Sequence, residues 1–416
     1  MLTCPRIVFL LLFLLLFLLL FLLLFPAPAP ADAPLPAVAE TPDYPGAVWA
    51  PASPANFWPS SRPSPAQPID RIVIHDIEGT VPDAVRHFQD SAARVSSHYV
   101  VDGETGRVTQ MVRERDIAWH AGDGPTNARS IGIEHAGYAY RPGFFNAVEY
   151  EASARLIRAI ARRYAIPRDR THIIGHFEVP DSAHPGHFGG RNGHTDPGPY
   201  WDWGYFMALV RSDARSGPGP LPPVFVLHPG QTARAEFLLA NTGDDPWPAD
   251  ADAAGRALGP VYLGVWGRTG SALSGPDWVS PRFVTLPVGG DTAPGASGRF
   301  IVPLHVPPAF LGRASAQFRL FRVPAAPGLP VPFGPILTAS VRVAPWDIRS
   351  TPGGRVALPA AGVWDVSVRR VGRWRRLGRF WFAGPAAVTE AWGALAAGQV
   401  RFVGPFFRGL GGRIEP

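Results

Sequence analysis

The sequence predicts an α/β domain, with a mixed central β-sheet flanked by helices, followed by an immunoglobulin-like β-sandwich and a small C-terminal β module. Up to residue 212, strand-like apolar runs alternate with one long stretch of helical periodicity. Beyond it, short apolar runs are separated by Gly, Pro and Asp turns. The chain has 45 Gly and 48 Pro, too many for an all-helical protein. Ten of its 12 histidines lie between His75 and His194, so the chemistry concentrates in the first domain.

Residues 1–39 are expected to be a signal peptide or a membrane anchor. An unbroken apolar run, 7–25, follows Arg6 and precedes A-x-A sites, which indicates export to the periplasm, the cell surface or the medium. As a helix the run would span roughly 28 Å, so an uncleaved anchor stays open. The only cysteine, Cys4, precedes the run, so it is not placed like a lipidated cysteine and no disulfide is expected. Residues 40–66 read as a Pro/Ala-rich spacer.

The first domain is expected at 67–212. Its predicted strands are 71–74, 97–101, 107–112, 130–134 and 171–175. A helix is expected to begin after Asn146 as N-cap, with Glu149 completing a capping box, and to end at Pro167. A second helix, 201–210, closes the domain.

A Pro/Gly-rich linker, 213–223, leads to the β-sandwich expected at 224–345. Its strand candidates are 224–227, 235–239, 261–266, 299–306, 316–321 and 336–343. Residues 346–416 are expected to form a basic β module with strands 363–371 and 379–382. Its expected aromatic anchors are Trp364, Trp374, Trp381 and Trp392.

The net charge of +6 is carried entirely by arginine, and it is uneven. Residues 346–416 hold eleven arginines against four acidic residues. We expect this module to meet an anionic cell-wall polymer or a membrane surface, and we expect no nucleic-acid partner.

Two histidines end strand-like runs, and an aspartate follows in a turn. His75 ends the run 72–74, His176 follows the run 173–175, and Asp196 lies twenty residues later in a Pro/Gly loop. Hydrolysis of an amide through zinc needs three protein ligands and one open position. Because Cys4 is the only cysteine, a zinc site here would use His and carboxylate ligands, the pattern of catalytic zinc.

Six segments in this order resemble the zinc-dependent N-acetylmuramoyl-L-alanine amidases of the phage-lysozyme and peptidoglycan-recognition-protein type. They are IVIH ending at His75, SHYVVD at 97–102, AWHAG at 118–122, NARSIGIE at 127–134, IGH at 174–176 and HTDPGP at 194–199. The resemblance covers about residues 68–210.

The resemblance implies Zn²⁺ bound by His75, His176 and Asp196. It also implies hydrolysis, by a zinc-activated water, of the amide between N-acetylmuramic acid and L-Ala of peptidoglycan. Glu134 matches the position of a catalytic Glu in the intracellular members of the family. A non-catalytic peptidoglycan-binding protein of the same fold is the chief alternative, and an envelope adhesion protein is another.

The chain departs from the family pattern near Asp196. Many members carry Lys two residues before that ligand, whereas this chain has His194. We expect His194 to donate a hydrogen bond to the oxyanion that forms when the amide carbonyl is attacked. The loop 177–193 is longer than in compact members and adds His184 and His187 as rival ligands; His176 is favoured because it ends a strand.

Several other residues are assigned roles around the site. Trp119, His120 and Asn127 are expected to bind substrate, His98 to be a structural hydrogen-bonder and Glu178 to support the ligands.

Overall fold

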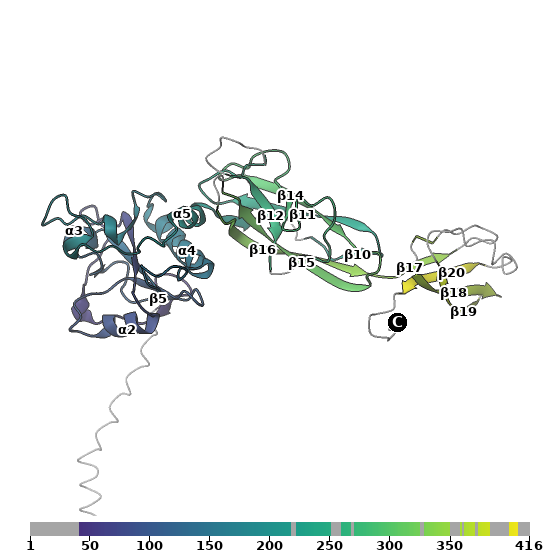
Figure 1. Ribbon diagram of the computed structural model, residues 1–416, viewed down its shortest axis with the longest axis horizontal. Helices are drawn as coiled ribbons and strands as arrows, with labels where there is room; N and C mark the ends of the chain where they lie inside the picture. The colour runs from purple at the N-terminus through teal and green to yellow at the C-terminus, as the bar shows by residue number, and fades with distance from the viewer. Residues whose placement is uncertain are drawn as a thin grey trace, which may run out of the picture.

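The computed structural model describes residues 41–217, 222–250, 259–267, 270–324, 328–349, 358–359, 362–370, 373–382 and 399–406 (Figure 1). The expected signal peptide or anchor, 1–39, lies outside the described residues. Among the helices of the described part, none is long and apolar enough to cross a membrane.

The first domain is built on a six-stranded mixed sheet. In spatial order its strands are β1 (Val48–Trp49), β5 (Val108–Gln110), β4 (Tyr99–Val101), β7 (Ser130–His135), β3 (Arg71–Asp76) and β8 (Ile173–Gly175). Strand β3 runs parallel to β7 and β8, whereas β5 is antiparallel to β4. The predicted mixed sheet is therefore confirmed.

Helices cover both faces of this sheet. They are α2 (Val81–Gln89), α3 (Gly124–Asn127), α4 (Ala147–Tyr164) and α5 (Trp203–Arg211), with short 3-10 turns η1 (Pro54–Asn56), η2 (His176–Glu178) and η3 (Gly190–Asn192). Ile72 and Ile74 pack in one core with Leu156 of α4, whereas Val73 packs on the opposite face with Ile174. Since side chains alternate along a strand, His75 projects from the Val73 face, away from α4.

The spacer expected at 40–66 is wrong for its described part, which folds onto the domain. Strand β1 pairs with β5, and β2 (Phe57–Trp58) pairs with β6 (Ile117–Ala118). The buried amide of Asn56 donates to the carbonyls of Phe88 and Asp90, each at 2.8 Å. Composition missed this because two-residue strands have no readable period.

Helix α4 begins where expected, but its capping box is absent. Asn146 Oδ1 accepts the N–H groups of Val148 and Glu149 at 2.9 and 3.3 Å. Glu149 does not reach back: it is fully buried and neither carboxyl oxygen has a hydrogen-bond partner. The helix ends at Tyr164, and its C-cap Ala165 adopts a left-handed φ of 54°, two residues before Pro167.

Two further sheets share one core after the first domain. The larger has the order β10 (Phe225–Leu227), β16 (Val331–Val343), β15 (Gly312–Arg322), β12 (Val261–Val265) and β13 (Phe283–Thr285). The smaller is β14 (Ser297–His305), β11 (Thr232–Asn241) and β9 (Ala214–Ser216). Because β9 pairs with β11, the linker expected at 213–223 is wrong for residues 214–216.

The last described strands form a separate four-stranded sheet. Its order is β17 (Trp346–Arg349), β20 (Val400–Phe406), β18 (Gly362–Arg370) and β19 (Arg373–Phe382). Trp364 is fully buried in its core, as an anchor should be. Trp381 is 67% exposed, so its expected anchoring role is wrong, and Trp392 and residue 371 lie outside the described residues.

Candidate active site

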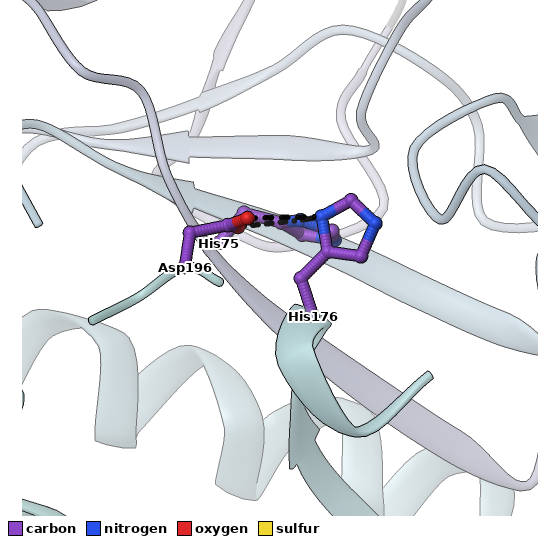
Figure 2. Close-up of side chains that lie close together, drawn as sticks. All are labelled: His75, His176 and Asp196. Carbon is purple, nitrogen blue, oxygen red and sulfur yellow. Dashed lines mark hydrogen bonds and ion pairs between the residues drawn. The ribbon is translucent and has the colours of Figure 1, made fainter. Parts of the chain in front are cut away.

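Three side chains meet at the carboxyl ends of two neighbouring parallel strands (Figure 2). His75 lies near the end of β3, His176 directly follows β8, and Asp196 comes from the loop beyond. His75 Nδ1 lies 3.1 Å from His176 Nδ1 and 3.2 Å from Asp196 Oδ2, and His176 Nδ1 lies 3.1 Å from Asp196 Oδ1. Parallel β3–β8 pairing, with Ile74 opposite Gly175, brings the two histidines together.

The chemistry of this donor set fits zinc. Among the described residues, these three offer ligand atoms that all lie within 4.8 Å of one another. Two imidazole nitrogens and one carboxylate oxygen are the ligand types of catalytic zinc. The two histidines are buried, so few water molecules compete for their nitrogens.

The protonation states also suit metal ligation. Burial, and then His176, lowers the pKa of His75 to about 4, so its imidazole is neutral at physiological pH. Burial acts to raise the pKa of Asp196, but the adjacent imidazoles of His176 and His75 outweigh it and hold that pKa well below its ordinary value. A neutral imidazole and an ionised carboxylate are the forms that bind metal.

Glu134 stands beside the cluster on β7. It is the register partner of His75, and paired residues of neighbouring strands project from the same face of the sheet. Burial, followed by the charges of Asp196 and Asp76, raises the pKa of Glu134 well above its ordinary value. The position of this carboxyl beside the cluster suits a proton-transfer group, and its catalytic role stays a prediction.

His194 covers the outer side of His176. The two rings stack with centroids 4.2 Å apart and planes 11° from parallel, and His194 Nδ1 lies 3.7 Å from Asp196 Oδ1. Its side chain is 44% exposed, so it can reach a ligand above the cluster. Burial and His176 lower the pKa of His194, so the neutral ring is the form that would donate a hydrogen bond. Its oxyanion role stays a prediction.

His120 and Asn127 were expected to bind substrate, and this expectation is corrected because both residues lie beneath the site. His120 is buried, with its Nδ1 3.0 Å from His75 Nε2. Asn127 is also buried, and its Oδ1 accepts the backbone N–H groups of His120 and Ala121 at 3.1 and 2.8 Å. The motif identified residues near the site, but a motif does not show on which side of the backbone a side chain lies.

Trp119 is half-buried in the same segment. Its ring packs edge-on against Trp58 with centroids 5.1 Å apart, and the guanidinium of Arg94 lies 4.8 Å from its centre. Trp58 is 51% exposed, so this aromatic pair can be reached from solvent. A substrate role for Trp119 stays a prediction.

The loop histidines do not join the three-ligand cluster. His184 Nδ1 pairs with Asp181 at 2.7 Å, and the His187 ring lies 6.1 Å from that of His184. Glu178 acts as a support, since its Oε2 accepts the N–H of Gly175, the residue before His176, at 2.8 Å. The structure thus favours His176 over both loop histidines.

Asp76 is a buried residue of the site that the sequence did not single out. Its backbone N–H lies 3.4 Å from Asp196 Oδ2, and its own Oδ2 accepts the N–H of Ala139 at 2.7 Å. Burial raises the pKa of Asp76 to about 7. The sequence could have indicated Asp76 as a site residue, because it directly follows His75 at the end of a strand.

Comparison with known proteins identifies the first domain. A family model described as N-acetylmuramoyl-L-alanine amidase matches residues 65–199. The chain is 34% identical over 180 residues to N-acetylmuramoyl-L-alanine amidase A of Achromobacter lyticus, covering 40% of this chain and 95% of that protein. It is 32% identical over 125 residues to 1,6-anhydro-N-acetylmuramyl-L-alanine amidase AmpD of Haemophilus influenzae, covering 28% of this chain and 60% of that protein.

Among solved structures, a mutant endolysin from Bacillus subtilis is 20% identical. That likeness covers 39% of this chain and 97% of the endolysin, with a TM-score of 0.29. The sequence match to the Achromobacter lyticus amidase extends over nearly all of that protein. The chain therefore belongs to the N-acetylmuramoyl-L-alanine amidase family.

Proposed function

We propose that the chain hydrolyses the amide bond between N-acetylmuramic acid and L-Ala of peptidoglycan. The observation that carries this proposal is the cluster of His75, His176 and Asp196 at the carboxyl ends of β3 and β8. The names of its relatives support the same reaction. A non-catalytic binding protein would have no need to keep all three ligands.

His75, His176 and Asp196 would hold Zn²⁺. When bound, zinc supplies a Lewis acid and an activated water. Glu134 takes the proton released by the attacking water and returns it to the leaving amine of L-Ala. Its pairing opposite His75 in the parallel β3–β7 ladder supports this role, because it places the carboxyl beside the cluster. His194 donates a hydrogen bond to the oxygen of the scissile carbonyl.

Zinc analysis and product identification on purified cell wall test this proposal. The full chain should hold about one zinc and release stem peptides with a free L-Ala amino group. His75→Ala and Asp196→Ala should lose both properties, because too few donors remain. Full zinc content in both variants would refute the ligand set, and a zinc-loaded wild type that binds cell wall without cutting it would establish the binding-protein alternative.

We also propose that the C-terminal module binds an anionic polymer or membrane surface. On one face of its sheet, five arginines surround two aspartates: Arg349, Arg369, Arg376, Arg379 and Arg401 with Asp347 and Asp365. The exposed ring of Trp381 lies on the same face. This excess of positive charge beside an aromatic ring supports an anionic partner. Equal retention of the chain on anionic and zwitterionic vesicles would contradict it.

Export and an immunoglobulin-like topology for 224–345 complete the proposal. The apolar segment after Arg6 supports export, which cell fractionation tests. Two sheets around one core support the sandwich.

A further inference from the structure

A chain of buried hydrogen bonds runs from His75 away from the ligand cluster into the domain. His75 Nε2 lies 3.0 Å from His120 Nδ1, and His120 Nε2 lies 3.0 Å from Ser130 Oγ. Ser130 Oγ in turn lies 2.7 Å from the carbonyl oxygen of Thr126. All four residues are buried, so no bulk water competes for these contacts.

The inner end of the chain fixes the direction of every proton in it. The carbonyl oxygen of Thr126 can only accept, so the Ser130 hydroxyl donates to it. Because serine has a single hydroxyl proton, its oxygen must act as the acceptor toward His120. His120 therefore carries its proton on Nε2.

The proton position on His120 determines the proton position on His75. His120 is buried beside other imidazoles, where an uncompensated charge is disfavoured, so its ring is neutral; with its proton on Nε2, its Nδ1 is a bare acceptor. Nδ1 of His120 then receives the proton of His75 Nε2. This leaves His75 Nδ1 bare, and Nδ1 is the atom that faces His176 and Asp196.

His176 reaches the same state by a shorter route. Its Nε2 lies 3.1 Å from the carbonyl oxygen of Ala121, which can only accept, so Nε2 carries a proton. In the neutral ring that binds a metal, Nδ1 is then bare. Two bare imidazole nitrogens 3.1 Å apart then lie beside a carboxylate. Their lone pairs repel unless a cation is shared between them.

We propose that Thr126, Ser130 and His120 are positioning residues that fix His75 in the tautomer that presents Nδ1 to the metal. This inference rests on the proposed function, because it takes the cluster to be a zinc site. Hydrogen bonds behind a ligating histidine set metal affinity by about 10–100-fold. Here the acceptor is a second imidazole whose own tautomer is set by a serine.

Gly132 gives the His120 ring its place. A Cβ built on Gly132 would lie 2.4 Å from Cγ and 2.7 Å from Nδ1 of His120. The backbone of Gly132 has no left-handed φ, so this glycine serves to leave space rather than to allow a turn. The β7 strand thus carries both the serine and the gap that hold the ring against His75.

Zinc dissociation constants of the full chain, measured by chelator competition, test the proposal with matched variants. His120→Leu fills the space without an acceptor, whereas His120→Gln keeps a carbonyl oxygen that can accept from His75. We expect zinc binding to weaken about 10–100-fold in His120→Leu and only a few-fold in His120→Gln, with Ser130→Ala between them. In ¹⁵N NMR spectra of the metal-free chain, His75 should be protonated on Nε2 in the wild type and mixed in His120→Leu.

Thermal unfolding of the metal-free proteins provides the control. A merely structural role would lower the Tm of both His120 variants without separating their zinc affinities, and that result would overturn the proposal. So would a wild-type His75 protonated on Nδ1. A wild type that binds no zinc would instead overturn the ligand set on which the proposed function depends.

Discussion

Glu134 and His75 occupy paired positions on neighbouring parallel strands, so the sheet itself sets their separation. Glu134→Gln keeps the shape of the side chain but removes its ability to take a proton. We expect this variant to lose at least about 100-fold in turnover, the lower end for general acid–base catalysis. Its zinc content and its retention on cell wall should match the wild type.

The matched control is Glu178→Gln, where the carboxylate accepts the backbone N–H of Gly175 and pairs with Arg170. This change should affect turnover less than Glu134→Gln. If Glu134→Gln turned over substrate at the wild-type rate, the base would have to be assigned elsewhere. If both variants lost zinc, the loss of activity would reflect a disturbed ligand set rather than proton transfer.

At the scale of elements, helix α4 carries a fully buried carboxyl group, that of Glu149. Burial is the main cause that raises the pKa of Glu149 to about 9, from an ordinary value of 4.5. The folded state therefore keeps a proton that the unfolded state releases, so stability falls as pH rises from 4.5 to 9. At pH 7 the destabilisation is on the order of 3 kcal/mol. Glu149→Gln, which needs no proton, should be more stable than the wild type at pH 8 and similar at pH 4.

Urea unfolding at a series of pH values measures this effect. The free energy of unfolding of Glu149→Gln should depend less steeply on pH between 5 and 8 than that of the wild type. Glu104→Gln, at an exposed turn position, is the control and should follow the wild type. Parallel pH profiles for Glu149→Gln and the wild type would show that Glu149 is ionised in the folded chain.

The sequence predicted those elements whose apolar period is long enough to read. Strands β3, β7 and β16 and helix α4 each contain the run or the helical face that predicted them. Strands β1, β2 and β6 have only two residues each, so their periods could not be read. Their positions depend on tertiary pairing, as when Trp49 meets Gln110 of β5. Helix α2 was missed although Val81, Ala84, Val85 and Phe88 line one helical face.

The sequence predicted the position of some site residues correctly and the role of others incorrectly. His75, His176 and Asp196 stand where the family resemblance put them, close together at one sheet edge. His120 and Asn127 were predicted in the segments that line the site, but as substrate-binding residues, whereas both are buried beneath it. A linear motif does not show which of its side chains are buried. The role of Ser130 could not be inferred from sequence, since it depends on a hydrogen bond to a ring ten residues away in the chain.

At the scale of the whole molecule, the first domain and the following two-sheet region share a packed boundary. Val331, at the start of β16, is buried in the hydrophobic core of the first domain. Arg319 of β15 donates to Glu151 of α4 at 2.9 Å, and its guanidinium lies 4.6 Å from the ring centre of Trp266. Arg322 donates to Ser212 Oγ at 3.2 Å. These contacts indicate that the two units unfold together, as expected of domains joined by a packed interface rather than by a flexible linker.

Breaking the Arg319–Glu151 pair should uncouple the two units. The side chains are 11% and 15% exposed, so removing one partner leaves a mostly buried charge with fewer partners, although Arg155 also lies 3.7 Å from Glu151. Arg319→Ala should lower the free energy of unfolding by about 1.5–3 kcal/mol and split a single calorimetric transition of the full chain into two.

Glu151→Ala should act similarly. The double variant should lose less stability than the sum of the single variants, because both changes remove the same interaction. Arg299→Ala is the control: its pair with Glu236 spans 3.9 Å between side chains 49% and 55% exposed and should matter little. Strict additivity of the Arg319 and Glu151 changes, or one unchanged transition in each variant, would show that the boundary is held by its apolar contacts around Val331 instead.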